Sequence, residues 1–192
     1  MPYLEAQLND VVIACAGADD VRVLSAQVIA SSSGSVSAGA YGIRDAGADT
    51  SEHLDWLSKF ISPGDKIQFA LLSRAEPTLP RLSSSQSTNP ESIAEVLKEI
   101  KAQFRQRYPD GVPSVPRVAH PMILRVSVDH QPPVTAALGD EEQLQVVLTW
   151  NQEGCALRVD SVTVLDGGHT KGQCWLIETL SSGQTVQVTY AT

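Results

Sequence analysis

Trp56-Leu57-Ser58-Lys59-Phe60-Ile61-Ser62-Pro63-Gly64-Asp65-Lys66-Ile67-Gln68-Phe69 is the stretch of this 192-residue sequence that decides the fold. A Ser-Pro-Gly-Asp turn leads into alternating polar and apolar residues, which is typical of a half-buried β-strand. The arrangement returns at Trp175-Leu176 and runs through Ser181-Ser182-Gly183-Gln184 into Thr185-Val186-Gln187-Val188. Between 56 and 71, five of sixteen residues are identical to those 119 positions later. Chance would give about one identity, so the sequence predicts an internal duplication.

Three further matches precede this one in the same order. Leu4, Leu8 and Leu24 correspond to Leu124, Val128 and Leu144, and Tyr41-x-Ile43-x-Asp45-x-Gly47 corresponds to Val162-x-Val164-x-Asp166-x-Gly168. Each copy holds roughly five or six short alternating segments, the number typical of a small sandwich or open barrel. We therefore expect a mainly β protein with two similar small β-sandwich or open-barrel lobes. Trp56 and Trp175 are interpreted as equivalent core anchors, with exposed sugar-stacking residues as the alternative.

Local charge divides the chain into the same two copies and a connector. Residues 1–73 carry 4 basic and 9 acidic side chains, residues 74–122 carry 7 and 5, and residues 123–192 carry 3 and 8. The predicted domains are therefore a β lobe at 1–73, a connector at 74–122 and a second β lobe at 123–192. Two lobes of net charge −5 flank a connector of net charge +2.

The connector contains the one segment with a helical pattern, at about 90–108. Asn89 can cap the helix and Pro90 suits its first position, while Tyr108-Pro109-Asp110-Gly111 ends it. Its apolar residues recur at helical spacing, at Ile93, Val96, Leu97, Ile100 and Phe104. Docking of this face onto the core is the more common arrangement, and binding to a partner is the alternative.

Composition limits the partners and the location of the protein. The chain has a formal net charge of −8, a pI near 4.9 and 42% apolar residues. These values support a folded core and disfavour nucleic acid or an anionic membrane as the main partner. The first residues resemble no signal peptide and no apolar run approaches the roughly 20 residues of a membrane span, so a cytoplasmic location is expected.

The polar residues form no pattern that requires a cofactor, a metal or a catalytic site. Cys15, Cys155 and Cys174 show no CxxC spacing, and the four histidines lie far apart without HxH or HxxxH spacing. No GxSxG elbow is present, and Cys15 and Cys174 lie in strand-like segments. We therefore predict no catalytic residues, no cofactor and no stoichiometric metal, and the protein is expected not to be an enzyme.

A weak family resemblance covers about the first 73 residues. His53-x-x-Trp56 followed by Ser62-Pro63-Gly64-Asp65-Lys66-Ile67-Gln68-Phe69 resembles uncharacterised bacterial proteins in which a Gly-Asp-Glu turn leads into a final alternating strand. The second copy has Gly172 and Gln184 where this pattern has His and Asp. The resemblance implies a β fold and carries no known activity.

Two acidic dipeptides are the candidate partner-binding residues: Asp19-Asp20 and Glu141-Glu142, at roughly matching positions of the two copies. As an acidic rim they suit a basic protein partner through charge complementarity. The predicted function is a non-enzymatic acidic protein-binding module, such as an immunity or inhibitor protein for a basic, nuclease-like toxin. The alternatives are an accessory or assembly protein of a secretion or phage-like system, and thirdly an enzyme with a site at the lobe junction. Partner identity and oligomeric state stay open.

Overall fold

The computed structural model describes residues 3–47, 50–73, 75–87, 98–99, 102, 106, 121–151, 153–164 and 170–191. The strands of the first half are β1 (Tyr3–Leu8), β2 (Val11–Ala16), β3 (Val21–Ser31), β4 (Val36–Gly47), β5 (Thr50–Phe60) and β6 (Lys66–Leu72). β7 (Leu82–Ser87) follows them. The second half contains β8 (Ile123–Val128), β9 (Val134–Ala137), β10 (Gln143–Asn151), β11 (Gly154–Val164), β12 (Thr170–Leu180) and β13 (Thr185–Ala191). The mainly β prediction is confirmed.

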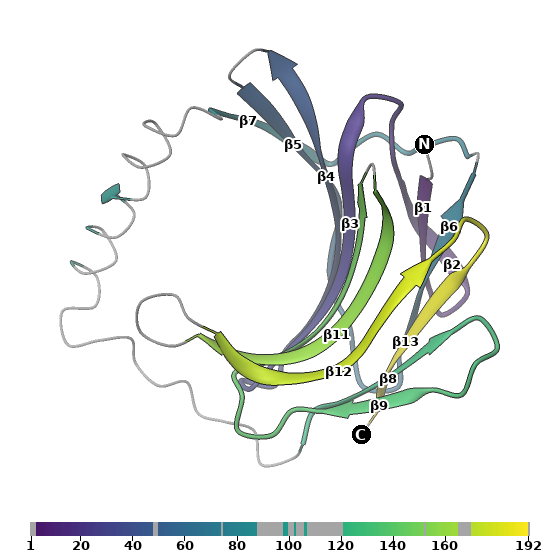
Figure 1. Cartoon of the computed structure of the whole chain (residues 1–192), viewed down its shortest axis with the longest axis vertical. Helices are drawn as coiled ribbons and strands as arrows, with labels where there is room; N and C mark the ends of the chain where they lie inside the picture. Colours follow the sequence, from purple (N-terminus) through teal and green to yellow (C-terminus); the bar gives the residue numbers. More distant parts are fainter. Residues whose placement is uncertain are drawn as a thin grey trace.

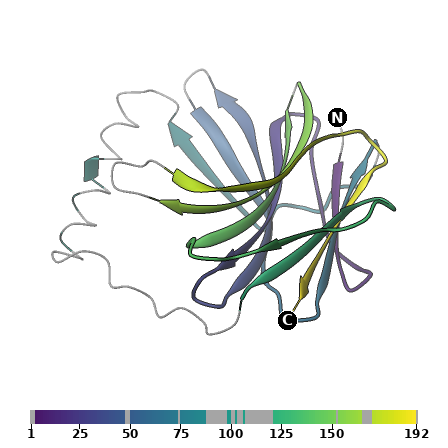
Figure 2. The same ribbon diagram turned by 60° about the horizontal axis from the view of Figure 1, so that its bottom comes forward.

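The strands form two antiparallel sheets that enclose one core. Sheet A has the order β2-β1-β6-β13-β8-β9, and sheet B has the order β12-β11-β10-β3-β4-β5-β7. Figures 1 and 2 show sheet B as a curved sheet, with β7 and β12 at its two edges. Alternate residues of both sheets point into the core, as in β6, where Ile67, Phe69 and Leu71 are buried and their neighbours are half-buried.

Each sheet contains strands of both halves, which corrects the prediction of two separate lobes. β6 pairs with β13 at the centre of sheet A, and β3 pairs with β10 in sheet B. Gln68 lies opposite Gln187, so the two strands that the sequence matched to each other are direct neighbours. If each half formed a sheet of its own, one edge of β3, β6, β10 and β13 would be unpaired. Pairing between the halves satisfies the backbone groups of these edges.

The two halves use the same strand order and the same registers. Leu4 lies opposite Ala16 in the first half, and Leu124 lies opposite Ala136 in the second. One extra residue interrupts the β4·β5 ladder at Trp56, because Ala40 pairs with Leu57 and Tyr41 with Asp55. The same β-bulge interrupts β11·β12 at Trp175, where Val159 pairs with Leu176 and Asp160 with Cys174.

This register changes one of the sequence matches. Tyr41 of β4 occupies the place of Asp160 in β11, rather than that of Val162. The sequence match failed there because alternating strands look alike when they are shifted by two residues. Ile43 likewise occupies the place of Val162 rather than that of Val164. The remaining predicted matches of that segment, at 166 and 168, lie outside the described residues.

The predicted helix at 90–108 lies almost wholly outside the described residues, and no helix forms an element of the described chain. Of that range only Lys98, Glu99, Ala102 and Gln106 are described, and these positions are helical. In the described parts, no helix has the length and apolar character needed to span a membrane.

Two equivalent turns are held by an amide and a carboxylate whose positions are exchanged between the halves. Asn9 Nδ2 donates to Asp65 Oδ1 at 2.8 Å in the first half, and Gln184 Nε2 donates to Asp129 Oδ2 at 3.0 Å in the second. Asn9 and Asp129 both have positive φ angles, of 50° and 49°. One amide and one carboxylate therefore close each turn.

The carboxylates of these turns should make stability depend on pH. Hydrogen bonds from Asn9 and then from the Ser62 backbone lower the pKa of Asp65, and those from Gln184 and then from the Thr185 backbone lower the pKa of Asp129. A lowered folded-state pKa favours the charged form in the folded protein. The resulting stability is complete above the unfolded-state pKa of about 3.9 and is lost as pH falls through the folded-state pKa.

The double variant Asp65→Asn/Asp129→Asn tests this dependence. We expect it to be less stable than the parent at pH 7, with a difference that shrinks as the pH falls from 5 to 3. Urea unfolding at a series of pH values measures the difference, with Glu153→Gln, an exposed turn carboxylate, as the control. A difference that stays constant over this range would contradict the assigned role.

Candidate functional site

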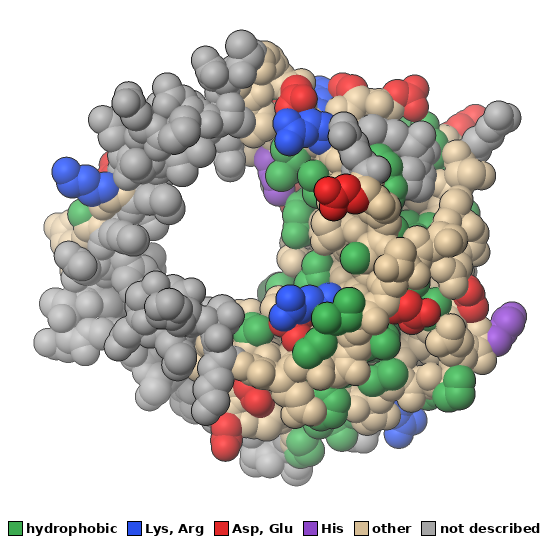
Figure 3. Space-filling model, viewed as in Figure 1, with side chains coloured by type: hydrophobic (Ala, Val, Ile, Leu, Met, Phe, Trp, Pro, Cys, Tyr) green, Lys and Arg blue, Asp and Glu red, His purple; other side chains and the backbone are tan. Residues whose placement is uncertain are grey.

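The structure places the two predicted acidic dipeptides at opposite ends of sheet B. Asp20 directly precedes β3, and Glu142 directly precedes β10. β3 and β10 run antiparallel with Gln143 opposite Ser31, so the starts of the two strands lie at opposite ends of the pair. Acidic side chains are accordingly spread over the face seen in Figure 3. The structure does not bring the four predicted residues together into one rim.

The predicted carboxylates already make contacts within the chain. Asp20 Oδ2 lies 3.0 Å from Arg44 NH1, and Asp19 Oδ1 accepts a hydrogen bond from the Tyr3 hydroxyl at 3.2 Å. Glu141 Oε2 accepts one from the Gly139 backbone N–H at 3.2 Å. The Asp20 side chain is therefore part of an ion pair as well as of the predicted binding surface.

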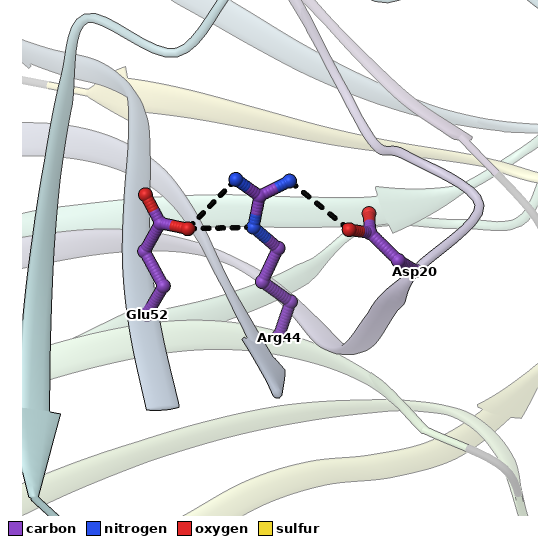
Figure 4. A network of polar contacts seen from close by, with 3 residues as sticks. All are labelled: Asp20, Arg44 and Glu52. Atoms are coloured by element: carbon purple, nitrogen blue, oxygen red, sulfur yellow. Dashed lines mark hydrogen bonds and ion pairs between the residues drawn. The ribbon is translucent and has the colours of Figure 1, made fainter. Parts of the chain in front are cut away.

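Arg44 links two carboxylates from separate strands and turns, as Figure 4 shows. Its Nε and NH2 atoms both lie 2.7 Å from Glu52 Oε2, while NH1 reaches Asp20. The hydrogen bond from Arg44 is the main cause of the lowered pKa of Glu52. Arg44 and Glu52 face each other because they are direct partners in the β4·β5 ladder. Sequence analysis missed this pair, although opposite charges on the two sides of a hairpin turn are a usable signal. The register shift between Asp45 and Gly47 makes the pair asymmetric about the turn, and the sequence does not show this shift.

Further charged residues gather at this end of sheet B, around a polar groove of about 460 Å³. Arg22, Val23, Asp45, Asn151 and Glu153 line the groove. Arg22 and Asp45 form an exposed ion pair at 2.9 Å, a type that contributes little to stability.

We call this region the acidic end. It comprises the carboxylates Asp19, Asp20, Asp45, Glu52 and Glu153 with the guanidinium groups of Arg22 and Arg44. Five negative charges against two positive ones leave a negative surplus beside an open groove. Such an arrangement can accept hydrogen bonds from cationic side chains of a ligand.

A second pocket, of about 400 Å³, opens where the two halves meet at one end of the sandwich. Its lining consists of Leu71, Ser73, Trp150, Gly154, Cys155, Leu180 and Ser182. Burial raises the pKa of the Cys155 thiol to about 11. The thiol is therefore protonated at neutral pH and lacks the thiolate character of a nucleophilic cysteine.

The tryptophans differ in burial although they occupy equivalent bulges. Trp56 is 3% exposed and Trp175 is half-buried. Trp56 Nε1 donates to the Thr78 carbonyl at 2.8 Å, whereas the buried Nε1 of Trp175 finds no hydrogen-bond partner in the part of the chain that the structure describes. The predicted role as a core anchor is therefore confirmed for Trp56, and Trp175 packs at the margin of the core.

Comparisons with known protein families, curated proteins and solved structures find no match to this chain. Within the described ranges, His, Cys, Asp and Glu side chains form no group of three or more that could hold a metal ion.

Proposed function

We propose that the protein is a non-enzymatic binding module that recognises a basic protein partner, as an immunity or inhibitor protein for a nuclease-like toxin does. The observation that carries this proposal is the acidic end, where Asp45, Glu153 and Arg22 line an open groove and the neighbouring network of Asp20, Arg44 and Glu52 adds further charge. Asp45 and Glu153 project at the groove and are exposed. Cationic side chains of a partner would find acceptors there without the need to break the Arg44 network.

Electrostatic steering supports the same proposal. The whole chain has a net charge of −8, and each half carries a surplus of acidic residues. Such a field increases the association rate of a basic partner, and the effect weakens when salt shortens the Debye length. Recognition of this kind affects association more than dissociation.

The proposal is tested by association kinetics. The partner is first captured from the source cell and identified by mass spectrometry, and its association rate with the protein is then measured. The acidic-end variant is Asp19→Asn/Asp45→Asn/Glu153→Gln, and the matched control at the opposite end is Glu141→Gln/Glu142→Gln. We expect the first variant to slow association on the order of tenfold at low salt and to flatten the salt dependence. The control also shows whether the second acidic dipeptide contributes. An association rate that is indifferent to salt and to both variants would exclude charge as the basis of recognition.

An internal duplication is part of the same proposal, because it explains how two matching sets of strands arose. The shared registers, the bulges at Trp56 and Trp175 and the exchanged amide and carboxylate of the two turns support it. Independent convergence would have to reproduce all three features in the same order.

An assembly or accessory protein is the second candidate function. The observation that favours it is the outer edge of β12, which pairs with β11 on one side and with no strand of the described chain on the other. Unpaired sheet edges are used to add strands from other chains.

A further inference from the structure

The segment that follows β6 covers the side of the first half where the edge strand β2 of sheet A lies near β5 of sheet B. We call this side the first-half margin, and the corresponding side at β9 and β12 the second-half margin. We call residues 75–87 the strap; it runs past β2 and ends as β7. Thr78 is its first anchor: its backbone N–H donates to the Cys15 carbonyl at 2.9 Å, and its Oγ1 accepts from the Cys15 N–H at 3.2 Å. The Thr78 carbonyl accepts the hydrogen bond from Trp56 Nε1 at 2.8 Å. One residue thus binds the edge of sheet A and the bulge of sheet B together.

The strap then adds a strand to sheet B. The Arg81 N–H donates to the Asp55 carbonyl at 2.6 Å, and β7 pairs antiparallel with β5 from Asp55 opposite Leu82 to Thr50 opposite Ser87. This pairing stops directly before the bulge at Trp56. Figure 1 shows β7 beside β5 at this edge of the sheet.

The second-half margin offers the equivalent backbone groups on β9 and β12, and no segment of the described chain covers it as the strap covers the first half. The register places Thr135 at the position of Cys15, Cys174 at that of Asp55, and Ile177 at that of Ser58. Thr135 and Cys174 are exposed, and Ile177 is 69% exposed, whereas Cys15 is buried under the strap. The edge of β12 beyond Cys174 has no partner strand among the described residues.

Trp175 supplies an independent sign that an acceptor belongs at this margin. Its indole Nε1 is buried and has no hydrogen-bond partner among the described residues, although the equivalent atom of Trp56 is satisfied by Thr78. A buried donor without a partner is rare in proteins and costs free energy, so its persistence calls for an explanation. A carbonyl placed as Thr78 places its own would remove this cost.

We propose that the second-half margin binds an extended segment of another polypeptide, which repeats in trans what the strap does in cis. A carbonyl of the bound segment accepts a hydrogen bond from Trp175 Nε1. The segment also adds an antiparallel strand to β12 at residues 170–174, the counterpart of the β5 segment that β7 pairs with. The strap sequence Pro77-Thr78-Leu79-Pro80-Arg81-Leu82-Ser83-Ser84-Ser85-Gln86-Ser87 specifies the chemistry of the partner. This chemistry is a threonine flanked by prolines at 77 and 80, then Arg81-Leu82, and then a run of small polar residues.

This docking is independent of the electrostatic recognition proposed above. The strap carries one acidic and one basic residue, Glu76 and Arg81, so a ligand of this type has no net charge. Backbone hydrogen bonds supply the affinity, and the association should therefore change little with salt. The strap of a second copy is already engaged with its own first half, which makes a segment of another protein the fitting occupant.

A capped synthetic peptide with the sequence of residues 75–87 is the probe. Titrated into the full chain labelled with ¹⁵N at the tryptophan indoles, it should shift the Trp175 resonance in a saturable way and leave Trp56 unchanged. Hydrogen exchange of residues 170–174 should slow on binding. Trp175→Phe should weaken binding roughly tenfold, while Trp150→Phe, a tryptophan outside this margin, should leave the affinity unchanged.

Peptide controls separate strand addition from nonspecific contact. The same peptide with Ser83→Pro and Ser85→Pro cannot complete an antiparallel ladder, so its affinity should fall at least tenfold. The inference is overturned if no binding occurs at about 1 mM peptide, if Trp175→Phe binds as tightly as the parent, or if the Trp56 resonance moves instead. A dimer of the chain in sedimentation, with residues 170–174 protected from hydrogen exchange in the absence of peptide, would show β12 occupied by a second copy and would also overturn the inference.

Discussion

Replacing Phe69 with alanine should lower the free energy of unfolding by about 3–5 kcal/mol. Phe69 is fully buried in β6, at the centre of sheet A, where it lies opposite Ala6 of β1 and Val186 of β13. Its ring is thus enclosed by strands of both halves, and its loss opens a cavity that neither half can close alone. Phe60→Ala is the matched control, because this ring is 77% exposed and its removal should change stability by less than about 0.5 kcal/mol.

The same experiment tests whether the halves form one cooperative unit. Chemical unfolding of the parent and of Phe69→Ala should give a single transition that coincides for tryptophan fluorescence and far-UV circular dichroism. Val188→Ala, at the equivalent position of β13, should cost a smaller amount of about 1.5–3 kcal/mol, because fewer carbon atoms are removed. Two separate transitions, with Phe69→Ala affecting one of them, would indicate independently folding halves.

Trp56→Phe should destabilise the protein more than Trp175→Phe, by about 1–2 kcal/mol. The first substitution removes the hydrogen bond from Nε1 and leaves the Thr78 carbonyl without its donor. The second removes a buried N–H that has no partner within the described ranges, so no hydrogen bond to these residues is lost. Both substitutions remove the same atoms, and each variant is therefore the control for the other.

Hydrogen exchange shows where the difference arises. In Trp56→Phe, the amides of Thr78 and Arg81, which donate to Cys15 and Asp55, should exchange faster because the strap is held less firmly. In Trp175→Phe, these amides should keep the exchange rates of the parent. Equal losses of stability in the two variants, with unchanged exchange in the strap, would refute the anchoring role of Thr78.

The sequence by itself determined that the protein is mainly β, and it placed the matching turns and strands at the ends of the two halves. Alternation in Lys66–Leu72 and Thr185–Ala191 placed two strands correctly, since a half-buried strand must alternate with period two. The turns at Gly64 and Gly183 could also be predicted, because glycine is the residue that most easily adopts the positive φ angle such turns require. The two glycines have φ angles of 88° and 93°. These features depend on neighbouring residues, and a local pattern is enough to predict them.

The candidate site could be predicted only in part. Asp19 and Asp20 do belong to the acidic end, but Arg44, Asp45 and Glu153 reach it from other strands and turns. Glu141 and Glu142 lie at the opposite end, because the antiparallel pairing of β3 and β10 turns the two matching acidic turns away from each other. A linear match carries no information on this relative direction.

Only the tertiary structure decided that the halves share both sheets and that the strap covers one margin alone. Alternation specifies which face of a strand is buried and leaves open which strand lies beside it. The pairing of Gln68 with Gln187 joins residues that are far apart in the chain, and so does the hydrogen bond from Trp56 to Thr78 that Trp175 lacks. These contacts form because backbone groups at strand edges and buried donors must find hydrogen-bond partners across the whole fold. No local stretch of sequence contains the information on which distant residue supplies the partner.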